Sequence, residues 1–218
     1  MGMNINTVLL VVIIANVLFS LKGLNDYSFF EKFKFQIGAI KQGQKIRMLT
    51  SGFLHADYMH LGMNMYVLYM FGPSVIGELG EIKFLMIYFG SLLIGNLLTL
   101  KYHDKELYYS AVGASGAVAG IIFSGILLHP GMKLMLFPIP ISLPSYVFGV
   151  GYLLYSIYGM KKQLGNIGHS AHLGGAIGGY ALTLFLKPSV FTDNLFIVLL
   201  IGAPIVLLLL FGSKLQRK

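Results

Sequence analysis

The stretch Gly113-Ala114-Ser115-Gly116-Ala117-Val118-Ala119-Gly120 interrupts a chain that is otherwise one apolar segment after another. It places a single hydroxyl among residues that have almost no side chain. Glycine and alanine on every side leave open space around this oxygen and allow another helix or a substrate backbone to approach closely. Ser115 is therefore the first candidate for chemistry in this chain.

The composition indicates an integral membrane protein. The chain has 218 residues, of which 56% are hydrophobic and 11% charged, and its mean hydropathy is +0.76, whereas soluble domains carry about 25% charged residues. It contains no cysteine, which excludes disulfides and thiol catalysis. The net charge of +8 comes from short loops between apolar runs. Basic residues in such loops favour binding to anionic lipid headgroups. We therefore expect membrane lipids as partners and no nucleic acid.

Seven apolar runs predict an all-α membrane protein, because a helix of about 20 residues spans a bilayer. The first run has no basic residue before it and no good cleavage site after it, so we interpret it as a spanning helix rather than a signal peptide. The last run precedes a basic tail, Lys214, Arg217 and Lys218. The runs cover residues 6–21, 58–76, 82–100, 115–128, 145–160, 168–186 and 195–211.

The long first loop, residues 22–54, mixes lysines with phenylalanines. Basic and aromatic side chains interleaved in this way favour the headgroup region, so we expect the loop to lie on or partly in the membrane surface. The alternative is a solvated linker.

The run 115–128 is too short to cross the bilayer. At about 1.5 Å per residue it extends roughly 20 Å, against a hydrocarbon core of about 30 Å. If His129-Pro130-Gly131 marks one membrane face, Ser115 begins its helix about 10 Å below the other. Non-helical backbone at that depth requires surrounding protein or water, so the sequence predicts a submerged, hydrated pocket.

A second stretch, Gly168-His169-Ser170-Ala171-His172-Leu173-Gly174-Gly175, supplies a base for Ser115. After Ser115, small residues recur at intervals of four and form one smooth helix face, and a second such face follows His172. The two helices can therefore pack backbone to backbone. These faces contain Gly116, Gly120 and Ser124, and Gly175, Gly179 and Thr183. Close packing predicts a nucleophile–base pair. No carboxylate lies in either span, so we expect a Ser–His dyad without a cofactor. His169 is the second choice for the base.

The third stretch carries His55, His60 and Asn64. His60 and Asn64 are four residues apart on one helix face, and two donors aimed near Ser115 would form an oxyanion hole. His55 lies off that face, and we expect it to order the loop entering the helix. A metal site built from these histidines is the rival hypothesis, but no acidic residue completes a zinc motif with them, so we expect no metal. His103 and His129 lie in loops and are expected to be solvated.

Taken together, these residues resemble the rhomboid family of intramembrane serine proteases. The match covers residues from about 44 to 186, and Glu78 also falls where the family usually has a glutamate. Its pieces are Phe53-Leu54-His55, His60-Leu61, Asn64-Met65, Gly113-Ala114-Ser115-Gly116, Ala171-His172-Leu173-Gly174-Gly175 and Gly179.

The resemblance implies a rhomboid-like six-helix bundle over residues 1–190, followed by a seventh transmembrane helix and tail over residues 191–218. It implies catalytic Ser115 and His172, with the oxyanion held by Asn64, His60 and the Ser115 N–H. The implied substrate is a transmembrane segment of another protein, which enters past the second and fifth helices. Phe148, Tyr152 and Tyr155 on the fifth helix are candidates for that entrance, or for ordinary packing.

Two departures from the family concern the loop and the base. The family's Trp-Arg pair in the first loop is Ile46-Arg47 here. The residue four after the serine, often an aromatic packed on the histidine, is Ala119.

Membrane orientation and function each leave an alternative. The family resemblance favours a bacterial plasma membrane with the site open to the outside. Most lysines and arginines, however, lie on the side where the site opens, and the positive-inside rule places that side in the cytoplasm.

The alternative function is a proteolytically silent rhomboid-like protein that binds or escorts membrane proteins. A transporter would show inverted repeats with broken helices, and we find no convincing repeat.

Overall fold

A computed structural model describes residues 5–135, 142–164 and 168–215, and its long helices match the seven apolar runs. Each begins within a residue or two of its run, and the 115–128 helix has the predicted bounds. Arg217 and Lys218 of the basic tail lie outside the described residues. The helices are α1 (Thr7–Asn25), α5 (Tyr58–Leu79), α6 (Glu81–Tyr102), α7 (Ser115–Leu128), α8 (Ser145–Lys162), α9 (His169–Leu186) and α11 (Leu195–Leu215).

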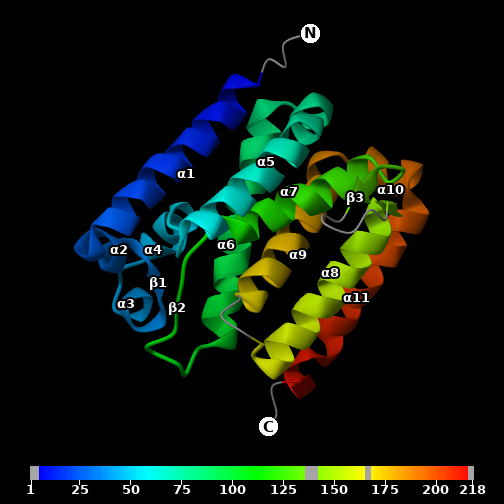
Figure 1. Cartoon of the computed structure of the whole chain (residues 1–218). Coiled ribbons are helices and arrows are strands. Elements are labelled where there is room, and N and C mark those ends of the chain that lie inside the picture. Colours follow the sequence, from blue (N-terminus) through cyan, green and yellow to red (C-terminus); the bar gives the residue numbers. More distant parts are fainter. Residues whose placement is uncertain (1–4, 136–141, 165–167, 216–218) are drawn as a thin grey trace.

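Helix α9 lies in the interior of the bundle, between α6 and α7 (Figure 1). Its contacts with α7 keep the same register along both helices: a Cβ on Gly175 would overlap the Gly116 backbone, and one on Gly179 would overlap the Gly120 backbone. The two helices therefore run parallel in backbone contact. This confirms the predicted packing of the two small-residue faces.

A neighbouring face of α9, about 100° around the helix, is also lined with glycine, which the sequence interpretation missed. A Cβ on Gly174 would lie 2.8 Å from the Gly95 Cα, and one on Gly178 would lie 3.0 Å from the Ser91 Cα. The numbering runs in opposite senses, so α6 and α9 are antiparallel. Two adjacent rows of glycine, one facing each neighbour, allow α9 to pack closely against both α6 and α7.

The segment between α1 and α5 is folded, although it was expected as one long loop from residue 22. Helix α1 continues to Asn25, and α2 (Tyr27–Phe33), α3 (Ile37–Lys41), α4 (Arg47–Thr50) and the 3-10 turn η1 (Ser51–Phe53) follow. Strand β1 (Phe35–Gln36) pairs antiparallel with β2 (Ser110–Ala111). This pairing ties the first loop to the segment that enters α7.

Arg47 holds this segment together from inside. Its side chain is buried and donates hydrogen bonds to the carbonyls of Glu31 and Lys34, at 2.7 and 2.8 Å, and to the Gln44 side chain. The neighbouring Ile46 is 60% exposed. The arginine of the Ile46-Arg47 pair therefore has a structural role within the loop, whereas the isoleucine points outward. Whether the loop lies in the headgroup region stays a prediction.

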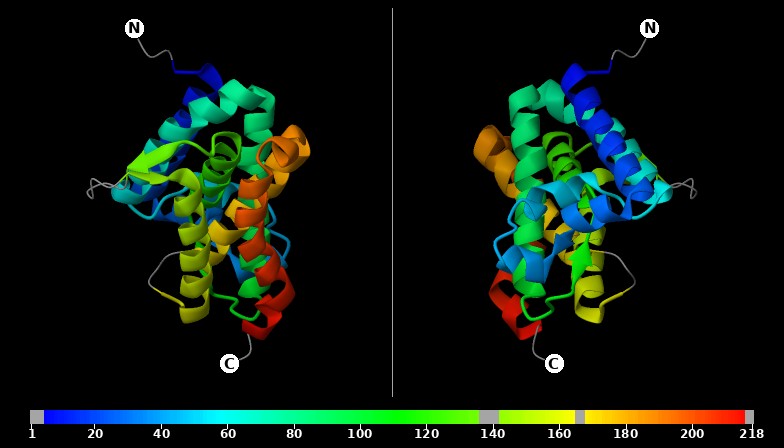
Figure 2. Two further views of the ribbon diagram at one scale, coloured as in Figure 1. Left: turned by 90° about the vertical axis from the view of Figure 1, so that its right-hand side faces the viewer. Right: turned by 90° about the vertical axis from the view of Figure 1, so that its left-hand side faces the viewer.

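Helix α11 packs beside α8 along one side of the bundle, as the views of Figures 1 and 2 agree. Its residues Ile197, Val198 and Ile201 are buried in the main hydrophobic core, and the Tyr180 hydroxyl of α9 donates to the Val198 carbonyl at 2.9 Å. The seventh helix thus completes the core. Short elements precede it: β3 (Lys133–Met135) pairs antiparallel with β4 (Ser142–Pro144), and α10 is Ser189–Asp193.

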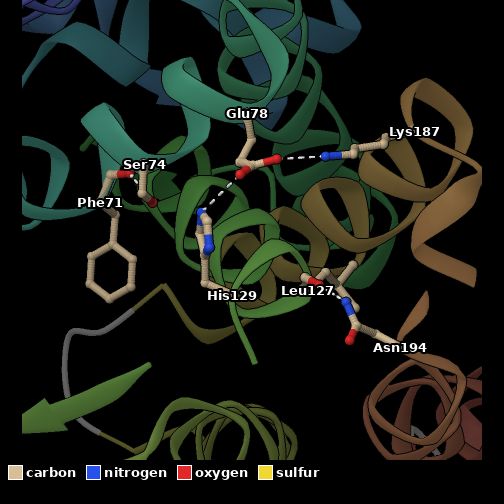
Figure 3. A network of polar contacts seen from close by, with 7 residues as sticks. All are labelled: Phe71, Ser74, Glu78, Leu127, His129, Lys187 and Asn194. Carbon is tan, nitrogen blue, oxygen red and sulfur yellow. Dashed lines mark hydrogen bonds and ion pairs between the residues drawn. The ribbon is translucent and has the colours of Figure 1, made fainter. Parts of the chain in front are cut away.

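Polar contacts join three helix ends at the end of α7 opposite Ser115 (Figure 3). The Glu78 carboxylate of α5 pairs with Lys187, which follows α9, at 2.6 Å, and lies 3.9 Å from His129, which follows α7. The Asn194 side chain donates to the Leu127 carbonyl at 3.2 Å. The Asn194 bond satisfies a carbonyl at the C-terminus of α7, where carbonyls lack partners within the helix. Lys187 neutralises the Glu78 carboxylate.

By length and composition, two of the described helices, Thr7–Asn25 and Glu81–Tyr102, are long and apolar enough to cross a membrane. The shorter helix α7 and the stretch Leu195–Leu208 of α11 are also apolar.

Candidate active site

Ser115 is the first residue of α7, and that helix begins in the middle of the bundle rather than at its edge (Figure 1). The chain reaches it through Gly113, whose φ of +128° is one that residues with a side chain rarely adopt. The Gly113 N–H donates to the Ser51 carbonyl at 3.0 Å. Because Ser115 opens its helix, its own N–H has no partner within the helix and is free to bind an anion.

The His60 ring lies directly over Gly113. A Cβ on Gly113 would stand 2.6 Å from His60 Cε1 and 2.8 Å from Nε2, and 3.6 Å from the Ser115 hydroxyl oxygen. The imidazole and the hydroxyl thus border the same small space, which a side chain at residue 113 would fill. This explains why the sequence has glycine there, and it places the His60 ring beside Ser115.

Asn64 lies one turn after His60 on α5 and is buried. Its amide nitrogen donates one hydrogen bond to the His60 carbonyl at 2.9 Å. An amide nitrogen has two hydrogens, so a second donor remains on Asn64.

His55 organises the backbone before Ser115, rather than only the loop that enters α5. Ser20 has a single proton and donates it to the Phe53 carbonyl at 2.8 Å, so it must accept the Nδ1–H of His55 at 2.8 Å. Nε2 of His55 then carries a lone pair and accepts the Ala114 N–H at 3.3 Å. Burial, reinforced by the neighbouring His60 ring, lowers the pKa of His55 to about 3. The neutral ring that this geometry requires is thus maintained at physiological pH.

His172 lies in the first turn of α9, facing the start of α7. A Cβ on Gly116 would lie 3.2 Å from the Ala171 carbonyl oxygen, so the residues directly after Ser115 and directly before His172 touch through their backbones. The packing therefore brings the two candidate residues to adjacent positions on neighbouring helices. Among the described residues, neither the Ser115 hydroxyl nor the His172 ring makes a side-chain hydrogen bond, and none joins the two.

The His172 ring instead stacks on Tyr152 of α8, with centroids 6.1 Å apart and planes 19° from parallel. Tyr152 in turn contacts Phe123 of α7 at 5.8 Å and Phe148 at 6.0 Å. The sequence interpretation left Tyr152 and Phe148 as candidates for a substrate entrance or for ordinary packing, and missed the contact with His172. No local spacing connects residues 152 and 172, so only the tertiary packing reveals it.

His169, the second candidate for the base, points away from Ser115. Its ring is buried against Gly159 and donates through Nε2 to the Leu164 carbonyl at 3.2 Å, both at the end of α8. It borders a cavity of about 160 Å³ together with His103 and others. His103 was expected to be solvated, which is wrong: it is 8% exposed and stacks on Tyr109 with centroids 3.6 Å apart.

The metal hypothesis gains no geometric support. In the described ranges, no group of three or more histidine, cysteine or acidic side chains lies close enough to hold a metal ion. The rings of His55 and His60 meet edge to face with centroids 4.9 Å apart. The hydrogen bonds of His55 show that both of its nitrogens already have protein partners.

Comparison with known proteins adds independent findings. A model of the rhomboid domain family matches residues 42–189. The chain is 31% identical over 149 residues to the mitochondrial rhomboid protein 1 of Saccharomyces cerevisiae, covering 67% of this chain and 43% of that protein. It is 33% identical over 144 residues to the rhomboid YdcA of Bacillus subtilis, covering 66% of this chain and 68% of that protein.

A human protein is similar to the chain over a stretch of comparable length. The chain is 33% identical over 140 residues to the human presenilin-associated rhomboid-like protein of mitochondria, covering 61% of this chain and 35% of that protein. The chain thus spans less than half the length of the yeast and human relatives. These proteins come from mitochondria as well as from a bacterium, so the expectation of a bacterial plasma membrane gains no support from them. The family model covers more than half of the chain, and the chain therefore belongs to the rhomboid family of integral membrane proteins.

Proposed function

We propose that the chain is an intramembrane serine endopeptidase that cleaves transmembrane segments of other proteins through a Ser115–His172 dyad. The observation that carries the proposal is the backbone contact between α7 and α9, which brings the start of each helix, and hence the two residues, together inside the bundle. Family membership supports the reaction class. The neighbouring His60, Asn64 and helix N-terminus supply the donors that acyl transfer needs.

In the proposed reaction the Ser115 oxygen attacks a peptide carbonyl of the substrate while His172 accepts the serine proton. The resulting oxyanion is stabilised by the Ser115 N–H, the His60 ring and the free N–H of Asn64. His172 then gives the proton to the leaving amine, and water releases the acyl group with His172 as the base. His172 has to turn toward Ser115 for the first step, because no hydrogen bond joins them in this structure.

The glycines contribute to this chemistry by excluding side chains. Gly113 leaves space between His60 and Ser115, and the smooth faces of Gly116, Gly175 and Gly179 bring the two helices close. Hydrolysis of the acyl group requires that water reach this space. A substrate in extended form fits such a space better than a helix does, so cleavage is expected where a transmembrane segment can unwind.

The test is reconstitution of the purified protein in liposomes with a single-span substrate, combined with labelling by a fluorophosphonate probe. Wild type should cleave and be labelled at Ser115, and Ser115→Ala and His172→Ala should do neither. Ser124→Ala is the matched control, because it removes a buried hydroxyl from the same helix and should leave cleavage intact. His169→Ala should retain labelling if His172 is the base.

A silent binding protein predicts another result. In that case Ser115 would not be labelled, and wild type would release no more product than Ser115→Ala while still retaining the substrate on purification. Cleavage equal in wild type and Ser115→Ala would overturn the proposed dyad.

A further inference from the structure

The His172 ring lies nearly parallel to the Tyr152 ring of α8. Among the described residues, the ring makes no hydrogen bond, and its ring contact is the stack on Tyr152 at 6.1 Å. A nearly parallel, offset pair of rings is a favourable geometry. An imidazole at the start of a helix can otherwise rotate about its side-chain bonds, so the neighbouring ring selects its orientation.

Tyr152 is itself held from two sides. Phe123 lies two turns beyond Ser115 on α7 and is fully buried, and its ring meets Tyr152 at 5.8 Å with planes 59° apart. Phe148, one turn earlier on α8, meets it at 6.0 Å. The tyrosine ring is therefore a fixed surface.

Helix α7 has nothing of its own to support the base. Ala119, one turn after Ser115, is buried but ends at its methyl group. The first aromatic side chain on that line of the helix is Phe123, and it reaches Tyr152 rather than His172. The support for the base thus comes from a different helix, α8.

We propose that Tyr152 is a positioning residue for His172: its ring holds the imidazole in the plane from which it turns toward Ser115. This inference rests on the proposed function, since it assigns a role within the same dyad. It also couples the base to α8, whose Leu154 and Tyr155 are more than half exposed on the outside of the bundle. A substrate or lipid that displaces α8 displaces the support of the base with it.

The test compares three variants on one helix. Tyr152→Leu removes the ring, Tyr152→Phe keeps it without the hydroxyl, and Tyr158→Leu is the control, since Tyr158 lies on the same helix and is 54% exposed. The measurements are kcat and KM for a reconstituted transmembrane substrate, and the rate at which a small fluorophosphonate labels Ser115. The probe reports on the dyad without requiring entry of a transmembrane helix.

Tyr152→Leu should lower both kcat and the labelling rate about tenfold, with KM within a factor of two. A tenfold change corresponds to ~1.4 kcal/mol, within the range for an aromatic pair. Tyr152→Phe should keep both rates near wild type, and Tyr158→Leu should match wild type. A merely structural role would lower the thermal midpoint and the active fraction, but would leave kcat and the labelling rate per folded, active molecule unchanged.

Several results would overturn the inference. They are a wild-type labelling rate in Tyr152→Leu, a change confined to KM, or a Tyr152→Phe variant as slow as Tyr152→Leu. If Tyr152→Leu does not fold, Tyr152→Met replaces it, because it keeps side-chain length without a ring. The inference and the proposed function fail separately: an unlabelled wild type refutes the dyad, whereas labelled wild type with equally labelled Tyr152→Leu refutes only the role of Tyr152.

Discussion

Replacing Gly175 by alanine tests the contact on which the site depends. The added Cβ would lie 2.7 Å from the Gly116 carbonyl carbon, whereas ordinary contact begins at 3.4 Å. The helices α7 and α9 must therefore separate by about 0.7 Å, the difference between these distances, and more to clear the carbonyl oxygen. No side-chain rotation relieves the overlap, because both partners are backbone.

The expected result is a larger effect on catalysis than on folding. A misplacement near 1 Å costs about 10²-fold in rate, so kcat should fall ten- to hundred-fold. Overpacking costs about 1–3 kcal/mol, offset by about 1 kcal/mol of helix propensity gained over glycine, so the thermal midpoint should fall by only a few degrees.

The assay is cleavage of a reconstituted transmembrane substrate, alongside thermal unfolding in the same detergent. Gly77→Ala is the control, because a Cβ there meets nothing within 4 Å. It should keep wild-type kcat and raise the midpoint slightly. Wild-type kcat and midpoint in Gly175→Ala would refute the backbone contact and, with it, the argument that glycine sets the spacing of the dyad.

Three further predictions concern other parts of the site and fold. Asn64→Ala should lower kcat by about 10²–10³ at nearly constant KM; a rise in KM alone would assign Asn64 to substrate binding instead. The pKa of His55 is about 3 in the folded chain against an ordinary 6.5, so the unfolded state binds more protons between these values. The free energy of unfolding should therefore fall as pH is lowered from 6.5 toward 3, and His55→Gln should flatten that slope; an unchanged slope would contradict the assignment. Glu78→Gln should lower the free energy of unfolding only slightly, since its pair with Lys187 is partly exposed; high salt should erase the difference, and a loss of kcat would show that this distant pair affects the site.

The helices and one of the two glycine faces could be predicted from sequence because both are periodic. Long apolar runs bounded by glycine, proline or charge give helix bounds to within a few residues. The spacing of four from Gly116 to Gly120, and from Gly175 to Gly179, identifies the faces that meet. The same reasoning did not find Gly174 and its neighbours on the other face, because a helix with so many glycines offers several smooth faces and sequence does not say which neighbour takes each.

The contacts of His55 could not be predicted for a different reason. Its partners Ser20 and Ala114 are 35 and 59 residues away, and no local pattern links polar residues across such distances. Burial of His103 was missed in the same way, since its position just after a helix suggested a solvated loop. Polar residues near helix ends are satisfied by tertiary contacts that the sequence alone does not display.

The site therefore combines two kinds of constraint, and they differ in how much change they tolerate. The spacing of Ser115 and His172 depends on main-chain contact at Gly116 and Gly175, where even one methyl group overlaps the neighbouring helix. In the proposed site, the orientation of the imidazole depends on an aromatic surface, the Tyr152 ring of α8. Ala119 leaves that task to Tyr152. The aromatic support thus comes from a third helix, whereas the glycine contact involves only α7 and α9. In the proposed mechanism, α8, on the outside of the bundle, therefore becomes part of the catalytic geometry.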